Sequence, residues 1–235
     1  MTDAEQLRDH LSISEDERGA KWRHRFYDLV ETAQLRRRDP RIFIGPDGFP
    51  YYALDLPDDD DDDGQDDVAV ADLIDLATDR GFGIAIEPLE ETAAWVFTCG
   101  DLVTRRAFGG FEFPRIGVVP ADTPTFRAVL KETERMEILP PDESMLPPYV
   151  RPLLHEYFTR KLGIADPGVL TLVSPDQEPR EQLVFRIARD DFADEEEFES
   201  AIAGLTWFLP RHFVVSILPS EVLEALDEAF VPLAA

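Results

Sequence analysis

The sequence predicts an α+β protein of two related units, each with the element order helix–strand–strand–helix–strand and a small, mostly antiparallel sheet covered by helices. Apolar residues make up 44% of the 235 residues, which is enough for a packed core. Segments with helical periodicity alternate with short β-rich runs. The same order occurs twice, in residues 14–120 and 149–235, and a helix with a proline-rich connector at 121–148 separates the two copies.

The first unit is predicted to begin after a flexible lead-in of residues 1–13. Ser14 and Glu17 have the spacing of a capping box and predict the start of a helix. The apolar side chains that follow share one helical face: Trp22, Phe26, Leu29, Val30 and Ala33. Pro40 is expected to end this helix. A hairpin is expected next, with strands at 42–44 and 49–56 around a Gly-Pro-Asp-Gly turn.

The remainder of the first unit is predicted as a loop, a helix, a strand and a second hairpin. The aspartate-rich residues 58–67 are expected to form a solvated acidic loop, because like charges disfavour compact structure. A helix is predicted over 68–80 and a strand over 83–87. Residues 94–97 and 102–108 are predicted as strands on either side of a turn at Cys99.

The second half of the chain is predicted to repeat this order after the connector. Within the middle segment a strand at 116–119 and a helix after Pro124 are expected, and Pro140, Pro141, Pro147 and Pro148 suit a linker. The elements predicted beyond it are a helix at 153–162, strands at 169–173 and 183–188, a helix from Asp194 to 205, a strand at 213–218 and a final helix at 220–230.

The charge of the chain is its most unusual property. Asp and Glu number 49 against 23 Lys and Arg, which gives a formal net charge of −26. Affinity for nucleic acid comes largely from neutralising phosphates, so this composition argues against nucleic acid and against anionic membranes as ligands. It favours a basic protein as partner, metal cations, or a saline cytoplasm. Acidity that serves solubility alone is the competing interpretation.

Cysteine usage and the N-terminal residues indicate a cytoplasmic protein. A single cysteine, Cys99, excludes an internal disulfide framework and fits a reducing compartment. The first residues are acidic and polar and do not resemble a secretory signal. The apolar stretches are far shorter than the ~18 residues that a membrane span needs.

No motif in the sequence predicts a cofactor, a metal site or catalytic residues. Asp59, Asp61, Asp63 and Gly64 match the first positions of a calcium loop, but Val70 stands where that loop needs a bidentate glutamate. The four histidines have no metal-ligating spacing, and none has a motif that links it to Cys99. The glycines form no phosphate-binding pattern.

Two segments stand out as candidate partner-binding regions. Residues 18–41 carry eight basic side chains against three acidic ones, inside an acidic chain. This basic segment either binds an anionic ligand or pairs with acidic side chains of the same protein. The second segment, 108–113, places three phenylalanines near two glycines and forms either an exposed patch or part of the core. The predicted partner-binding residues are Lys21, Trp22, Arg25, Phe108, Phe111 and Phe113.

The chain resembles the bacterial SseB-type family, which is named for enhanced serine sensitivity. The resemblance lies in the element order and in Leu73-Ile74-Asp75-Leu76 leading through Gly81-Phe82-Gly83-Ile84 to Ile86-Glu87-Pro88. The family pattern ends this strand with G-[LI]-x-[IV]-N-P, and Glu87 stands in place of the asparagine. Residues 149–218 suit the second domain of that family. The resemblance implies a bacterial protein and supplies no catalytic residues.

These observations predict a non-enzymatic bacterial protein that acts as an acidic protein-interaction module, of which an immunity or inhibitor protein would be one case. Electrostatic steering would speed the encounter with a basic partner and make it sensitive to salt. Two alternatives stay open: an enzyme whose site is assembled from residues distant in sequence, and a salt-adapted protein with no charge-based partner.

Overall fold

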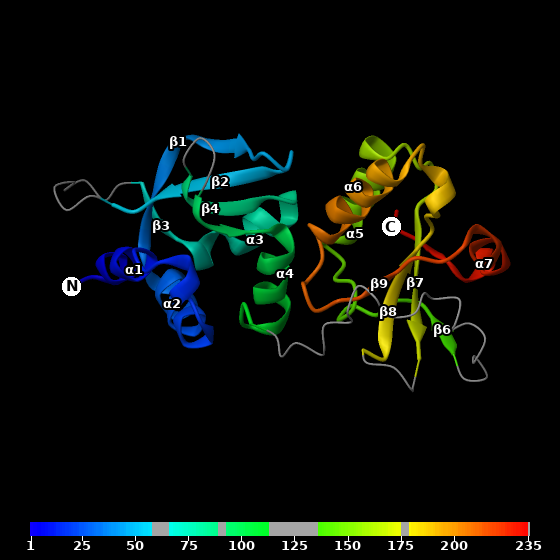
Figure 1. Cartoon of the computed structure of the whole chain (residues 1–235), viewed down its shortest axis with the longest axis horizontal. Helices are drawn as coiled ribbons and strands as arrows, with labels where there is room; N and C mark the ends of the chain where they lie inside the picture. The colour runs from blue at the N-terminus through cyan, green and yellow to red at the C-terminus, as the bar shows by residue number, and fades with distance from the viewer. Residues whose placement is uncertain (58–65, 89–92, 113–135, 175–178, 235) are drawn as a thin grey trace. The chain divides into compact units, whose positions relative to one another are not determined.

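The computed structural model describes residues 1–57, 66–88, 93–112, 136–174 and 179–234, and it confirms the α+β class. The chain divides into two compact units, Met1–Glu112 and Phe113–Ala235 (Figure 1). The boundary lies earlier than residue 120, where the sequence placed the end of the first unit.

Unit 1 is built on a mixed sheet with the strand order β3-β1-β2-β4-β5. Its strands are β1 (Gln34–Ile44), β2 (Pro50–Asp55), β3 (Asp67–Ala69), β4 (Gly83–Pro88) and β5 (Ala93–Phe97). Only β2 and β4 are parallel, and the other neighbours are antiparallel. The parallel pair requires a crossover, which a helix between these two strands supplies.

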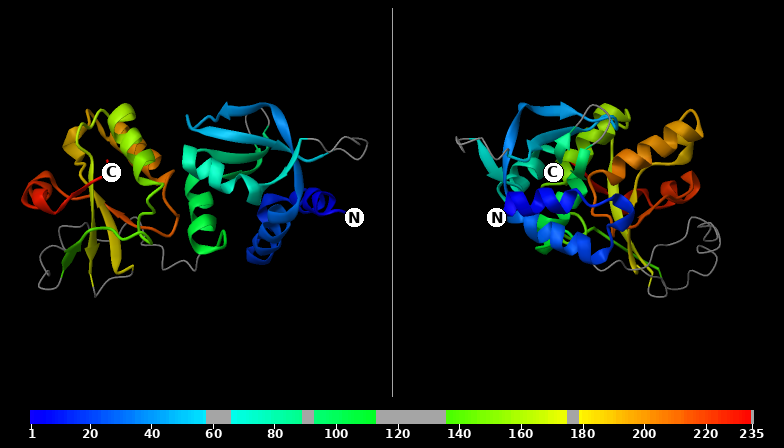
Figure 2. Two further views of the ribbon diagram at one scale, coloured as in Figure 1. Left: turned by 180° about the vertical axis from the view of Figure 1, so that it is seen from behind. Right: turned by 60° about the vertical axis from the view of Figure 1, so that its left-hand side comes forward.

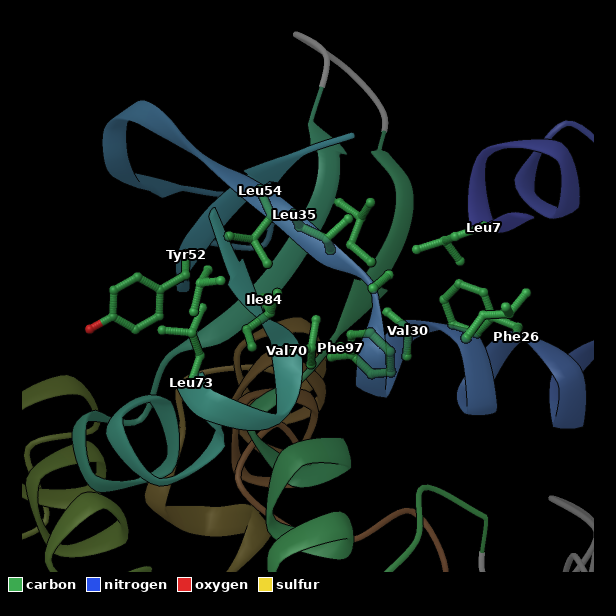
Figure 3. Packing of buried hydrophobic residues seen from close by; sticks show 14 of the residues in the cluster. Leu7, Phe26, Val30, Leu35, Tyr52, Leu54, Val70, Leu73, Ile84 and Phe97 are labelled. Atoms are coloured by element: carbon green, nitrogen blue, oxygen red, sulfur yellow. The ribbon is translucent and has the colours of Figure 1, made fainter. Parts of the chain in front are cut away.

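The helices of unit 1 cover this sheet and bury its apolar face. They are α1 (Asp3–Leu11), the short helical turn η1 (Glu15–Glu17), α2 (Ala20–Thr32), α3 (Val70–Arg80) and α4 (Cys99–Phe108). Figure 3 shows Phe26 and Val30 of α2 and Leu73 of α3 directed toward Leu35 and Ile84 of the sheet. Phe26, Val30, Leu35 and Ile84 are fully buried. The core of unit 1 therefore lies between the sheet and these helices.

Residues 3–11 form α1, so the prediction of a flexible lead-in over residues 1–13 is wrong there. Thr2 and Glu5 make the capping box that starts the helix. Leu7 is fully buried and belongs to the same core as Phe26 and Val30. The apolar spacing Ala4, Leu7, Leu11 carried the signal for this helix, and the surrounding charged residues obscured it.

The helix predicted from Ser14 starts later and ends earlier than expected. The hydroxyl of Ser14 donates to Asp16 within η1, and α2 begins after Gly19. The helix ends at Thr32, because Ala33 adopts an extended backbone. The helix was expected to continue as far as Pro40, but residues 34–41 belong to β1. The predicted strand at 42–44 is therefore the last part of a longer strand.

The predicted second hairpin of unit 1 is wrong, because its second arm is helix α4. Thr98 accepts a hydrogen bond from the backbone N–H of Asp101, and the Asp101 carboxylate accepts one from the N–H of Thr98 at 2.9 Å. This reciprocal capping starts a helix directly after β5, and Gly109 ends it at a φ of 79°. The predicted helix at 68–80 is confirmed from Val70 onward as α3, whereas Val68 and Ala69 belong to β3, which the sequence did not predict. The predicted strand at 83–87 is confirmed as β4.

Unit 2 repeats the helix-and-sheet plan around its own mixed sheet, ordered β10-β7-β8-β9, with β6 also paired to β7. Its strands are β6 (Glu137–Leu139), β7 (Gly168–Val173), β8 (Glu181–Phe185), β9 (Val215–Ser216) and β10 (Val231–Pro232). Its helices are α5 (Arg151–Glu156) with the π-helical segment Tyr157–Lys161, the short helical turn η4 (Arg189–Asp191), α6 (Glu195–Thr206), α7 (Ser220–Ala225) and the turn η5 (Asp227–Ala229). These elements confirm the predicted order, although the strand expected at 213–218 is reduced to β9.

A glycine allows α6 to pack closely against the helix that precedes β7. The Tyr157 hydroxyl donates to the carbonyl of Ala201 at 2.9 Å. A Cβ at Gly204 would lie 2.0 Å from that hydroxyl oxygen. Glycine at this position therefore leaves room for the hydroxyl end of the tyrosine ring beside α6.

The two units share one topology. In unit 1 the order α2-β1-β2-α3-β4 gives an antiparallel pair followed by a parallel neighbour. In unit 2 the order α5-β7-β8-α6-β9 gives the same two pairings in the same sequence. The expected strand at 116–119, the helix after Pro124 and the acidic run 58–63 lie outside the described residues.

Leu7→Ala is expected to lower the free energy of unfolding of unit 1 by about 2–5 kcal/mol, because it leaves a cavity under α1. Denaturant unfolding of a Trp207→Phe background checks this, since Trp22 and Trp95 of unit 1 then report the transition. Asp9→Ala, at an exposed position of α1, is the matched control. Equal stability of the two variants would contradict the packing of α1.

Thr98→Ala is expected to cost about 0.5–2 kcal/mol, because it removes the side-chain cap of α4. Thr98→Ser keeps the hydroxyl and is expected to retain most of that stability. The same fluorescence-detected unfolding measures both variants. A loss of the same size in the serine variant would contradict a capping role for the hydroxyl.

Candidate functional site

Two of the predicted partner-binding residues belong to the core of unit 1. Trp22 is only 6% exposed, and its indole N–H donates to the carbonyl of His10 at 2.9 Å. The Arg18 guanidinium lies 4.8 Å from the centre of the Trp22 ring. Phe111 is half-buried and lies against Tyr27 and Phe97, with ring centroids 5.1 and 4.7 Å away. Their aromatic rings thus serve packing rather than an exposed patch.

The other predicted residues that the structure describes differ in exposure and come from two helices, α2 and α4. Lys21 and Arg25 are exposed on α2, and Arg25 donates to the side-chain carbonyl of Gln6 at 2.7 Å. Phe108 is half-buried at the end of α4. Phe113 lies outside the described residues. The structure brings Trp22 and Phe111 into one aromatic cluster and leaves Lys21 on the surface.

The basic segment 18–41 is matched by acceptors of the same unit. In β1, Arg36 lies 3.6 Å from Asp67, Arg38 lies 3.7 Å from Asp55, and Arg41 lies 3.3 Å from Asp66. Arg18 donates to the carbonyls of Leu11 and Ile13 at 2.7 and 3.0 Å, and Arg23 lies 3.8 Å from Glu112. These contacts favour the interpretation in which the segment pairs with its own protein.

Arginines elsewhere in unit 1 also link one element to the next. Arg105 of α4 makes two parallel contacts with Glu31 of α2, at 2.6 and 3.2 Å. This bidentate geometry is the strong form of an arginine–carboxylate pair. Arg106 of α4 contacts Asp75 and Asp79 of α3 at 3.0 and 2.5 Å. Many of the arginines of unit 1 thus contact carboxylates of a neighbouring element.

Unit 2 presents the densest stretch of carboxylates that the structure describes. Residues 190–199 contain seven acidic side chains, and all seven are exposed: Asp190, Asp191, Asp194, Glu195, Glu196, Glu197 and Glu199. Some of them have structural roles. Asp194 caps α6 by accepting from the N–H of Glu197 at 2.9 Å, and negative charge near a helix N-terminus is stabilising. The sequence pattern predicted Asp194 only as the start of a helix, although the acidic run is visible in the sequence.

Cys99 has the environment of a structural thiol. It is fully buried at the start of α4. Burial, with a smaller contribution from the Asp101 carboxylate, raises the pKa of the Cys99 thiol to about 12. A nucleophilic cysteine needs the opposite shift, toward thiolate at neutral pH.

The histidines and acidic residues form no metal site within the ranges that the structure covers. His10 stacks on Trp22 with ring centroids 4.7 Å apart, and its Nε2 lies 2.8 Å from the Trp22 carbonyl oxygen. Burial lowers the pKa of His212 in unit 2. In the same ranges no helix is long and apolar enough to cross a membrane.

Glu87 ends β4 in a conformation that is uncommon for glutamate. Its φ is 50°, in the left-handed region, where asparagine is accommodated more readily. The Glu87 carboxylate accepts a hydrogen bond from the N–H of Leu56 at 2.6 Å, and this contact ties the end of β4 to the end of β2. This is the position at which the SseB-type pattern has asparagine.

Comparison with known proteins assigns no family to this chain. No family model, no curated protein sequence and no solved structure matches it. The resemblance to SseB-type proteins stays a prediction, and any functional proposal has to come from the residues themselves.

In the folded chain the Cys99 thiol is expected to react with iodoacetamide at about pH 8 roughly a thousandfold more slowly than in denatured chain. The raised pKa lowers the thiolate fraction, and burial restricts access of the reagent. Mass spectrometry of timed samples, with and without guanidinium, measures the two rates. Similar rates in both conditions would contradict the burial of this residue.

Proposed function

We propose that this chain is a non-enzymatic protein-interaction module that binds a basic partner through its surplus of carboxylates. The observation that carries the proposal is the unequal use of the two charges. Residues 1–112 contain 27 acidic and 12 basic side chains, and most of the arginines contact acceptors of the same unit. Within the described ranges of unit 1, 19 acidic side chains stand against these 12 basic ones, so the surplus charge there is negative.

The exposed carboxylates of unit 2 support the same proposal. Glu196 and Glu199 are exposed on α6, within the acidic stretch 190–199. A surface with one sign of charge raises the association rate of an oppositely charged partner, and the effect falls as salt is added. We expect binding that is strong at low ionic strength and weak at about 0.5 M salt, where the screening length is only a few ångströms.

The test begins with the immobilised full chain and a cell lysate at low salt. A retained protein that elutes near ~0.5 M salt is identified, purified and titrated against the free chain by calorimetry. The proposal predicts a discrete basic protein with salt-sensitive affinity. The proposal would be overturned if no protein is retained, or if the affinity of the retained proteins does not change with salt.

With that purified partner, the double substitution Glu196→Gln and Glu199→Gln is expected to weaken binding roughly 2- to 30-fold at low salt. Each exposed charge pair contributes about 0.2–1 kcal/mol. Glu137→Gln with Glu143→Gln removes the same charge from other exposed positions of unit 2 and is the matched control. Equal weakening by both pairs would show that net charge alone, and not the α6 surface, determines affinity.

A further inference from the structure

The outer edge of β1 is covered along only part of its length. On one side β2 pairs with β1 as far as Ile44. On the other side β3 pairs only with Gln34–Arg36, and the N–H of Arg37 then donates to the carbonyl of Asp66. Past that point, no strand in the described parts of unit 1 borders the outer side of β1. In Figure 1 and the left view of Figure 2, this end of β1 lies at the margin of the sheet beside β2.

The hydrogen-bonding alternation shows which residues face that open edge. The N–H of Gly45 donates to the carbonyl of Phe49 at 2.8 Å, so Gly45 and Phe49 occupy a hydrogen-bonded position of the hairpin. Hydrogen-bonded and non-hydrogen-bonded positions alternate along an antiparallel pair. Ile44, opposite Pro50, and Ile42, opposite Tyr52, therefore direct their N–H and C=O groups away from β2. Pro50 has no N–H to donate, which is consistent with a position that makes no hydrogen bond to Ile44.

The side chains at this edge are apolar and exposed. Ile42 is 39% exposed and Ile44 is 65% exposed. Protein edges are usually protected by proline, charge or a bulge, and β1 has all three just before this point, at Arg38, Asp39, Pro40 and Arg41. Residues 42–44 lack such protection.

Unit 2 shows what covers the equivalent edge. β7 occupies the position of β1 in the shared topology. Its outer edge is paired antiparallel by β10 at Gly168 and Val169 and by β6 at Thr171–Val173. β6 contributes the adjacent aliphatic residues Ile138 and Leu139. The fold thus accepts short aliphatic strands on this edge of its sheet.

We propose that the edge of β1 at residues 42–44 receives an extended segment of the basic partner, which adds a strand to the sheet of unit 1. The segment has aliphatic side chains at alternate positions, in contact with Ile42 and Ile44, and lysine or arginine on either side. The basic character follows from charge: Arg41, next to this edge, already contacts Asp66, the carboxylates of Asp39 and Asp47 on either side of residues 42–44 are exposed, and the unit has an acidic surplus. This inference rests on the proposed function.

The same charge argues against a second copy of the chain as the occupant. Each copy carries a formal charge of −26, and pairing two β1 edges would bring both acidic units together. A basic segment loses no such energy on approach and gains main-chain hydrogen bonds along the strand.

The test uses a short synthetic peptide of alternating threonine and valine between paired lysines. Calorimetry measures its affinity for the full chain, and amide hydrogen exchange measures protection at Ile42 and Ile44. The proposal predicts binding with increased protection at both amides, and no binding of the analogue in which glutamates replace the lysines. Protection elsewhere but not at these amides, or equal binding of the acidic analogue, would overturn it.

Variants of the edge separate main-chain from side-chain contributions. Ile44→Pro removes an outward N–H without removing a hydrogen bond to β2, and it is expected to weaken peptide binding roughly tenfold. The double substitution Ile42→Thr and Ile44→Thr keeps the β propensity and removes the exposed aliphatic surface. It tests the edge if the proline variant does not fold. Leu76→Gln, at a 40% exposed position of α3, is the control and is expected to bind normally.

The partner from the lysate experiment distinguishes this inference from the proposed function. Salt-sensitive binding that is weakened by the β1 variants and unchanged by Leu76→Gln supports both. Salt-sensitive binding that all β1 variants retain leaves the proposed function standing and overturns the edge as its docking site.

Discussion

The charge that unit 1 presents at its surface depends on contacts between its arginines and acceptors of the same unit. Arg105 joins α4 to α2, Arg106 joins α4 to α3, and Arg36 joins β1 to β3. Several of these side chains are half-buried, and ion pairs that water still reaches contribute only about 0–1 kcal/mol each. Their larger consequence is for the surface, because they neutralise arginines, while the described parts of unit 1 contain more acidic than basic side chains.

That surplus connects the fold to the proposed function. The two units share one topology, but the first-strand edge is paired by β10 and β6 in unit 2 and is left open beyond Arg37 in unit 1. An acidic surface attracts a basic protein from a distance and lacks shape specificity. An open strand edge with Ile42 and Ile44 supplies directional hydrogen bonds and apolar contact at short range. In the proposed function, the acidic surface would set the rate of association and the strand edge would set the specificity.

Much of the fold was predictable from the sequence, because strong local patterns carried it. The periodicity of Trp22, Phe26, Leu29 and Val30 marks the buried face of α2, and the duplicated element order is present in the structure. The candidate site was less accessible. A tryptophan in a basic helix suggests a ligand contact. Trp22 is instead buried with Arg18 over its ring, and this burial depends on the packing of the folded unit. The apolar pattern of residues 102–108 is compatible with a strand, but the reciprocal cap between Thr98 and Asp101 starts a helix there. The end of the β1–β3 pairing at Arg36 also has no local sequence signal.

The most direct test of this account is whether residues 18–41 attract anions. Calorimetric titration of the full chain with heparin, at about 0.01 M salt where the screening length is about 30 Å, measures this. The account predicts no detectable binding, because the arginines of this segment already contact Asp55, Asp66, Asp67 and Glu112. Salt-sensitive heparin binding that is lost when Lys21 and Arg25 are replaced by glutamine would contradict it.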